Sequence, residues 1–263
     1  MAGCSRAPSM SSSRRPTLAP VRGTTGSDSG RAGARASLVS PYDLNPMGKN
    51  PLREILAETI DFERLARAPT KLFITATNVR TGRGHVFKND AVTPDVLLAS
   101  ACLPTMFQAV EIDGEPYWDG GYSGNPTITP LIRECKSQDT ILVQINPVER
   151  ESSPRSASEI LNRLNEVSFN AVLLKELRMM ALLRQVADPG NSEGAQWAGM
   201  RIHRIASEIL TELGASSKLN AEWEFFSLLR DEGRRSAQVF LESHASDLGR
   251  RSTLDIDVLL EQI

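Results

Sequence analysis

Asp119-Gly120-Gly121, a carboxylate followed by two glycines, is the group in this sequence best placed to do chemistry. It closes a segment in which Asp113-Gly114 separates two apolar runs. That pair predicts a two-residue β-hairpin loop, because a type I′ turn needs positive φ at both central residues. The second strand of the hairpin would bring Asp119 to an exposed loop. The glycines would let the backbone turn sharply and let another segment or a substrate come close. A carboxylate in that position could act as a general base.

A base of this kind needs a nucleophile, and three glycine–serine patterns could offer one. The segment 26–30 has Asp28 where the serine should stand, and no apolar strand precedes it. Ser123, in 121–125, lacks the final glycine of a Gly-x-Ser-x-Gly motif and is too close to Asp119 in sequence to be its partner. We therefore do not expect either segment to supply a catalytic serine.

The third pattern, Gly190-Asn191-Ser192-Glu193-Gly194, matches Gly-x-Ser-x-Gly literally. It follows a helix-ending turn at Ala187-Asp188-Pro189, whereas the motif has catalytic meaning only between a strand and a helix. We read it as a loop between helices. A site rebuilt around Ser192 or Ser123 is the least favoured hypothesis.

The histidines and cysteines give little support to other chemistry. A Ser-His-Asp arrangement using His85 is possible, but a solvent-facing strand histidine is the favoured interpretation. The three cysteines are odd in number and show no paired spacing, which argues against a disulfide framework and a zinc site.

Hydrophobic periodicity predicts the elements that must hold these residues. Up to about residue 150 the sequence predicts alternating helices and strands: helices at 52–67 and 93–102, and strands at 72–79, 84–88 and 141–145. Asn125-Pro126 predicts a helix start, with Asn as N-cap and Pro at the first helical position. Beyond Pro154 only helices are predicted, at about 156–187, 196–213, 217–230, 232–247 and 253–261.

Residues 71–130 closely resemble the C-terminal part of a patatin-like phospholipase domain. The stretches that carry the resemblance are 71–78, 98–104 and 118–121, and it extends back to about Ser40 and forward through 201–205 and 217–223. The resemblance implies a three-layer α/β/α fold with a helical C-terminal extension. It also implies hydrolysis of lipid acyl esters by a Ser-Asp dyad, with Asp119 as the base and with neither metal nor organic cofactor. Gly120 and Gly121 would shape the loop of the base.

The rest of the family's site does not appear in the sequence. The family places its serine in a Gly-x-Ser-x-Gly elbow and forms its oxyanion hole with an upstream glycine-rich turn, and the residues before Asp119 contain neither element. We therefore expect a domain that is incomplete at its N-terminus and a chain that is inactive alone. The competing hypothesis is a non-catalytic remnant that binds a lipid or a protein.

Composition divides the chain into three parts. Residues 1–38 are rich in Ser, Arg and Gly and are expected to be disordered, 39–150 to be the patatin-like part, and 151–263 to be the helical extension. The strand at 72–79 is expected to have an uncovered edge, which would favour self-association.

Charge and hydropathy limit the classes of partner that we expect. The formal net charge is −2, and basic residues alternate with acidic ones, so a nucleic-acid partner is not expected. No run approaches the about 18 apolar residues of a membrane span, and no secretory signal is recognisable. The sequence thus indicates a cytoplasmic protein whose partner is a lipid or acyl-ester substrate, with a membrane surface as one place to meet it.

Overall fold

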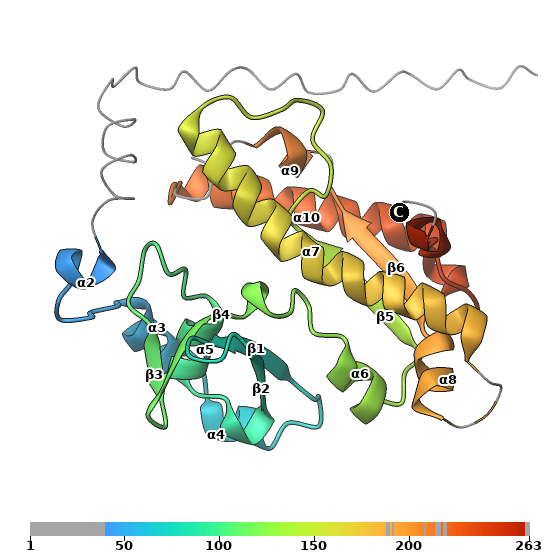
Figure 1. Cartoon of the computed structure of the whole chain (residues 1–263), viewed down its shortest axis with the longest axis horizontal. Helices are drawn as coiled ribbons and strands as arrows, with labels where there is room; N and C mark the ends of the chain where they lie inside the picture. Colours follow the sequence, from blue (N-terminus) through green and yellow to red (C-terminus); the bar gives the residue numbers. More distant parts are fainter. Residues whose placement is uncertain are drawn as a thin grey trace, which may run out of the picture.

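The computed structural model describes residues 40–187, 190, 192–207, 209–213, 217 and 220–260. The segment 1–38, expected to be disordered, lies outside these residues. The described residues form a mixed α/β fold with a four-stranded sheet, a two-stranded sheet and a largely helical C-terminal part (Figure 1). This arrangement confirms the predicted α/β fold class with a helical C-terminal part.

Three short helices come first: α2 (Pro41–Leu44), α3 (Leu52–Thr59) and α4 (Phe62–Ala66). The single helix predicted for 52–67 is therefore wrong, because the chain breaks at Ile60. The cause is Asp61, whose carboxylate accepts a hydrogen bond of 2.9 Å from the Arg64 backbone N–H and so starts a new helix.

The four-stranded sheet is antiparallel throughout, in the order β2-β1-β4-β3. Its strands are β1 (Phe73–Asn78), β2 (Gly84–Lys88), β3 (Val110–Ile112) and β4 (Glu115–Asp119). A short 3₁₀ turn, η1 (Asn89–Ala91), leads to helix α5 (Pro94–Ser100), which packs on the sheet. Their shared core consists of Ala76, Phe87, Val96, Ala99 and Tyr117.

The strands at 72–79 and 84–88 and the helix at 93–102 are thereby confirmed, but the expected free edge of the first strand is wrong. β1 is paired on both sides, by β2 and by β4. The prediction failed because the hairpin carrying Asp119 returns to cover that edge, which local sequence could not reveal.

After β4 come the 3₁₀ turn η2 (Gly120–Tyr122) and helix α6 (Thr129–Glu134). The helix start predicted at Asn125-Pro126 is wrong. That peptide bond is cis, and the helix begins three residues later. The Ile128 backbone N–H donates instead to the Glu176 carboxylate at 3.0 Å, so a distant residue fixes where α6 begins.

The second sheet pairs β5 (Asp139–Gln144) in parallel with β6 (Arg201–Ala206). It lies between the long helices α7 (Ala157–Val186) and α10 (Trp223–His244) (Figure 1). β6 contradicts the helix predicted at 196–213, which is replaced by α8 (Glu193–Ala198), β6 and α9 (Ile209–Glu212).

Local sequence patterns predict the bounds of one of the two long helices but divide the other in two. α7 agrees with the helix predicted at 156–187 and opens on a capping box formed by Ser156 and Glu159. α10 replaces the two helices predicted between 217 and 247. The turns η4 (Ala245–Asp247) and η5 (Asp257–Leu260) follow it, the second in place of the helix predicted at 253–261.

A second core joins this sheet to α7. Its buried members are Ile128, Ile132, Leu142, Leu173, Leu177, Met180, Ala181, Trp197, Met200, Ile202 and Ile256. They come from both sides of residue 150, and the domain boundary predicted there stays a prediction. The strand predicted at 141–145 is only half-buried, since Ile141 and Val143 are 44% and 71% exposed. No helix among the described residues combines the length and apolar character needed to cross a membrane.

The Asp139 carboxylate ties this second sheet together. It accepts two hydrogen bonds from the Arg201 guanidinium at 2.9 and 2.7 Å, and one from the Gly249 backbone N–H at 2.9 Å. The ring of His203, which is fully buried, lies 3.1 Å from the same carboxylate. One side chain thus joins the starts of β5 and β6 to the segment after α10. The Arg201 guanidinium holds the pKa of Asp139 far below its usual range, with help from Gly249 and His203.

We predict that Asp139→Asn lowers the melting temperature at pH 7 by roughly 5 to 10 °C, because it removes the negative charge to which Arg201 and the Gly249 N–H donate hydrogen bonds. A depressed folded pKa contributes stability above the unfolded carboxyl pKa of about 3.9, and that contribution disappears as pH falls through the folded value. The difference in melting temperature between the parent protein and the variant should therefore become smaller below about pH 4. Thermal melts from pH 3 to 8 test this. Asp231→Asn, at an exposed pair with Arg230, is the control and should change little.

Candidate functional site

The hairpin predicted from the sequence is present as β3 and β4, and its second strand ends at Asp119. Asp113 and Gly114 have φ of 52° and 78°, and Ile112 pairs with Glu115 across them, so the loop has two residues with positive φ. At the far end of β4, Asp119 pairs with Ala76 of β1. Its backbone N–H donates to the Cys102 carbonyl at 2.8 Å. Asp119 is therefore fixed by its pairing with β1 and by its backbone hydrogen bond to Cys102.

Gly120 turns the chain directly against β1. A Cβ at this position would lie 1.9 Å from the Thr75 carbonyl oxygen, which no side chain could tolerate. The Thr77 hydroxyl donates to the Asp119 carbonyl at 2.8 Å and secures the same turn. The close approach expected from the first glycine is thus made by another strand of the protein.

Gly121 faces α7 on the other side of the loop. A Cβ there would lie 2.8 Å from the Phe169 ring and 3.1 Å from the Asp119 carboxylate. The next residue, Tyr122, packs edge-on against Phe169 with ring centroids 5.0 Å apart. The loop is therefore enclosed between β1 and α7, and Asp119 is half-buried rather than on the exposed loop that the sequence predicted.

This burial sets the electrostatics of the carboxylate. Desolvation raises the pKa of Asp119, and a hydrogen bond of 2.7 Å from the Gly121 backbone N–H to Oδ1 partly opposes the rise. Among the described residues no side chain donates to this carboxylate, which leaves Oδ2 without a hydrogen-bond partner. A carboxylate with a raised pKa and one free oxygen has the properties of a proton acceptor.

Neither Ser123 nor Ser192 forms a hydrogen bond with the Asp119 carboxylate, and both bond to other groups. The Ser123 hydroxyl is 2.8 Å from the Thr77 hydroxyl and 3.2 Å from the Gly120 carbonyl, so it supports the loop's backbone. Ser192 is the N-cap of α8, where its side chain accepts from the Ala195 backbone N–H at 3.2 Å. Ser192 therefore caps a helix, and no strand leads into it. The pattern with Asp28 at its centre lies outside the described residues.

The remaining reactive side chains do not gather at Asp119. His85 is exposed on β2 and stacks near Phe87 with ring centroids 4.4 Å apart, which fits the solvent-facing interpretation. Burial raises the pKa of the Cys102 thiol to about 11, which leaves it a weak nucleophile. Within the described part of the chain, no cluster of His, Cys, Asp or Glu is suited to hold a metal ion.

Sequence reasoning missed the residues that enclose this loop. Phe169 lies mid-helix in α7, and Glu176, seven residues on, anchors the chain that leaves the loop. Desolvation raises the pKa of Glu176. Neither residue carries a local signal, because each acts on a segment about fifty residues away. Thr77 supports the loop through the hydrogen bond from its hydroxyl to the Asp119 carbonyl.

We predict that Gly120→Ala destabilises the protein by about 3 kcal/mol, because the added methyl would overlap a carbonyl of a central strand. Gly233→Ala is the matched control. Gly233 lies inside α10 with no atom within 4 Å of an added Cβ, so alanine should stabilise by about 0.5 to 1 kcal/mol. Urea unfolding of the three proteins measures both effects. Equal effects for the two variants would contradict the close packing of Gly120 on β1.

Comparison with known proteins finds a match for the part of the chain that contains this site. Residues 33–132 match the family model described as patatin-like phospholipase. No curated protein matches the chain significantly. The matched segment contains the four-stranded sheet, the hairpin and Asp119, and it ends within α6. The likeness expected beyond residue 132 stays a prediction. The segment that carries the hairpin and Asp119 is thus similar to patatin-like phospholipases.

Proposed function

We propose that this chain takes part in the hydrolysis of lipid acyl esters, with Asp119 as the general base of a Ser-Asp dyad. The observation that carries the proposal is the carboxylate itself, which a hairpin presents half-buried inside the segment that matches patatin-like phospholipases. Its pKa is raised by desolvation and its Oδ2 atom has no hydrogen-bond partner among the described residues.

The proposed chemistry assigns different roles to the two carboxylate oxygens. Oδ1 stays bonded to the Gly121 backbone N–H, which holds the side chain in one orientation. Oδ2 accepts the proton of a serine hydroxyl as the serine oxygen attacks the ester carbonyl carbon. When the tetrahedral intermediate collapses, the leaving alcohol takes that proton. Asp119 then accepts a proton from the water that releases the acyl group.

A raised pKa favours this role. A carboxylate with an ordinary pKa of about 3.9 is a weak base at neutral pH, and proton transfer improves as the pKa of the base approaches the working pH. Desolvation of Asp119 by β1 and α7 acts in that direction.

We further propose that the serine comes from a patatin-like segment that carries a glycine-rich turn and Gly-x-Ser-x-Gly. Ser123 and Ser192 do not fit the part, since the first bonds Thr77 and the Gly120 carbonyl and the second caps α8. On this proposal the chain alone has no esterase activity above background.

The alternative is a non-catalytic module that binds a lipid or a protein. The lack of a serine hydroxyl bonded to Asp119 among the described residues favours it. The two hypotheses differ in one respect that can be measured: only a true dyad makes hydrolysis depend on Asp119.

We predict that joining residues 40–263 to a patatin-like segment with the missing serine restores hydrolysis of acyl esters. Asp119→Asn should reduce the rate on the order of 10³-fold or more, because the serine loses its base. The control is Asp113→Asn, in the turn of the same hairpin, where asparagine tolerates the positive φ. Turnover of a chromogenic acyl ester and labelling by a serine-directed fluorophosphonate give two readouts.

Two results would contradict the proposal. A folded fusion whose ester hydrolysis is unchanged by Asp119→Asn would show that the carboxylate is only part of a turn. Labelling of Ser192 or Ser123 in the unfused chain would assign the nucleophile to a residue that we regard as structural.

A further inference from the structure

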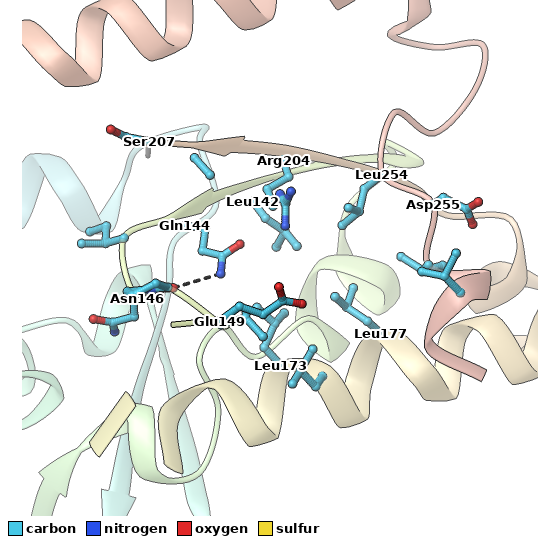
Figure 2. A pocket seen from close by; sticks show the side chains of 17 residues that line it. Leu142, Gln144, Asn146, Glu149, Leu173, Leu177, Arg204, Ser207, Leu254 and Asp255 are labelled. Atoms are coloured by element: carbon cyan, nitrogen blue, oxygen red, sulfur yellow. Dashed lines mark hydrogen bonds between the residues drawn. The ribbon is translucent and has the colours of Figure 1, made fainter. Parts of the chain in front are cut away.

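A second site lies away from Asp119, in a pocket of about 640 Å³ between the β5–β6 sheet and α7 (Figure 2). The two strands run parallel, and both end beside the pocket, at Gln144 and Ala206. In open sheets of parallel strands, the crevice outside the carboxyl ends is where ligands bind. The volume is within the about 300 to 1,000 Å³ of small-molecule sites. Asp119 is not among the residues that line it.

The floor of the pocket is apolar. It is built by leucines from three elements, Leu142 of β5, Leu173 and Leu177 of α7, and Leu254 after α10 (Figure 2). The first three belong to the second core, and Leu254 packs against it. An alkyl chain lying on this floor would remove further apolar surface from water at about 25 cal/mol per Å².

Arg204 is unusual for its place on β6. It pairs with Leu142, and its neighbour on the same face, Ile202, is fully buried in the core. A strand position facing a helix ordinarily carries an apolar residue, yet here a guanidinium points into the pocket (Figure 2). Within the described residues Arg204 has neither an ion pair nor a side-chain hydrogen bond. Its charge is free to meet an anion.

Two carboxylates, Glu149 and Asp255, bring the opposite charge to the same pocket (Figure 2). Glu149 is the one that lies near Arg204. Its side chain comes from the loop after β5 and lies between Arg204 and Leu173 (Figure 2). No ion pair joins Glu149 to Arg204, and within the described residues Glu149 has no other partner. A purely anionic ligand would therefore meet attraction from Arg204 and repulsion from the carboxylates of Glu149 and Asp255.

We propose that this pocket binds a single-chain amphiphile with a zwitterionic head group, of the lysophospholipid type. The acyl chain lies on the leucine floor, the phosphate meets Arg204, and the ammonium meets Glu149. The positive charge of Arg204 and the negative charges of Glu149 and Asp255 select a zwitterion over a fatty acid. Binding here needs no turnover, so its outcome is independent of ester hydrolysis at Asp119.

The test uses the chain in calorimetric titrations with 12-carbon lysophosphatidylethanolamine and with the 12-carbon fatty acid, both below their micellar concentrations. We expect the zwitterion to bind more tightly. Arg204→Gln should weaken it about tenfold or more, because a charge-assisted hydrogen bond is lost. Arg83→Gln removes the same charge from the β1–β2 turn, outside the pocket, and should leave both affinities unchanged.

Glu149→Gln separates this proposal from simple attraction to a basic residue. It should weaken binding of the zwitterion several-fold and strengthen binding of the fatty acid, because the repulsion from the carboxylate near Arg204 is removed. Both pocket variants replace exposed side chains, and their melting temperatures verify folding. The proposal is overturned if no lipid binds below the micellar concentration, if the fatty acid binds the parent more tightly, or if Arg204→Gln and Arg83→Gln behave alike.

Discussion

The contact between Gly120 and the Thr75 carbonyl is the constraint on which the candidate site depends. Only a residue without a side chain lets the loop lie directly on β1, and only then does Asp119 pair with Ala76 and keep its carbonyl within reach of Thr77. The same approach brings the loop under α7, whose Phe169 closes it from the other side. Desolvation of the carboxylate, and hence its raised pKa, is a consequence of backbone packing.

Helix α7 connects this site to the rest of the molecule. Phe169 packs on the Asp119 loop, Glu176 holds the start of α6, and Leu173 and Leu177 belong to the core under the β5–β6 sheet. One helix therefore encloses the candidate base and also forms the floor of the separate amphiphile pocket. A change that shifts α7 should therefore affect both places. Different residues of α7 contact them: Phe169 at the Asp119 loop, and Leu173 and Leu177 at the pocket.

Local chemistry in the sequence was enough to predict the hairpin and the close approach at the first glycine. Asp113-Gly114 can adopt positive φ at both positions, and that property resides in the two residues themselves. The end of the second strand at Asp119 and the sharp turn at Gly120 were predictable because they also follow from residues within this short segment. The long helix α7 was also predictable, since its capping box and apolar spacing lie within one segment.

Elements that depend on distant partners were not predictable in this way. The spacing of Ile202, Ile205 and Ile209 fits a helix, yet Arg201–Ala206 is a strand because β5 pairs with it, with Arg201 bonded to Asp139 62 residues earlier. The start of α6 was misplaced because Glu176 of α7 fixes it. Pairing and tertiary hydrogen bonds override local propensity at these positions.

Titration of the Asp119 carboxyl by carbon NMR tests the central claim most directly. The resonance is assigned by its loss in Asp119→Asn, and its chemical shift is followed as a function of pH. We predict a pKa above the ordinary aspartate value of about 3.9, since burial between β1 and α7 disfavours the charged form. A pKa at or below that value would mean that the carboxylate is well solvated or paired, and it would contradict the role of Asp119 as a desolvated base.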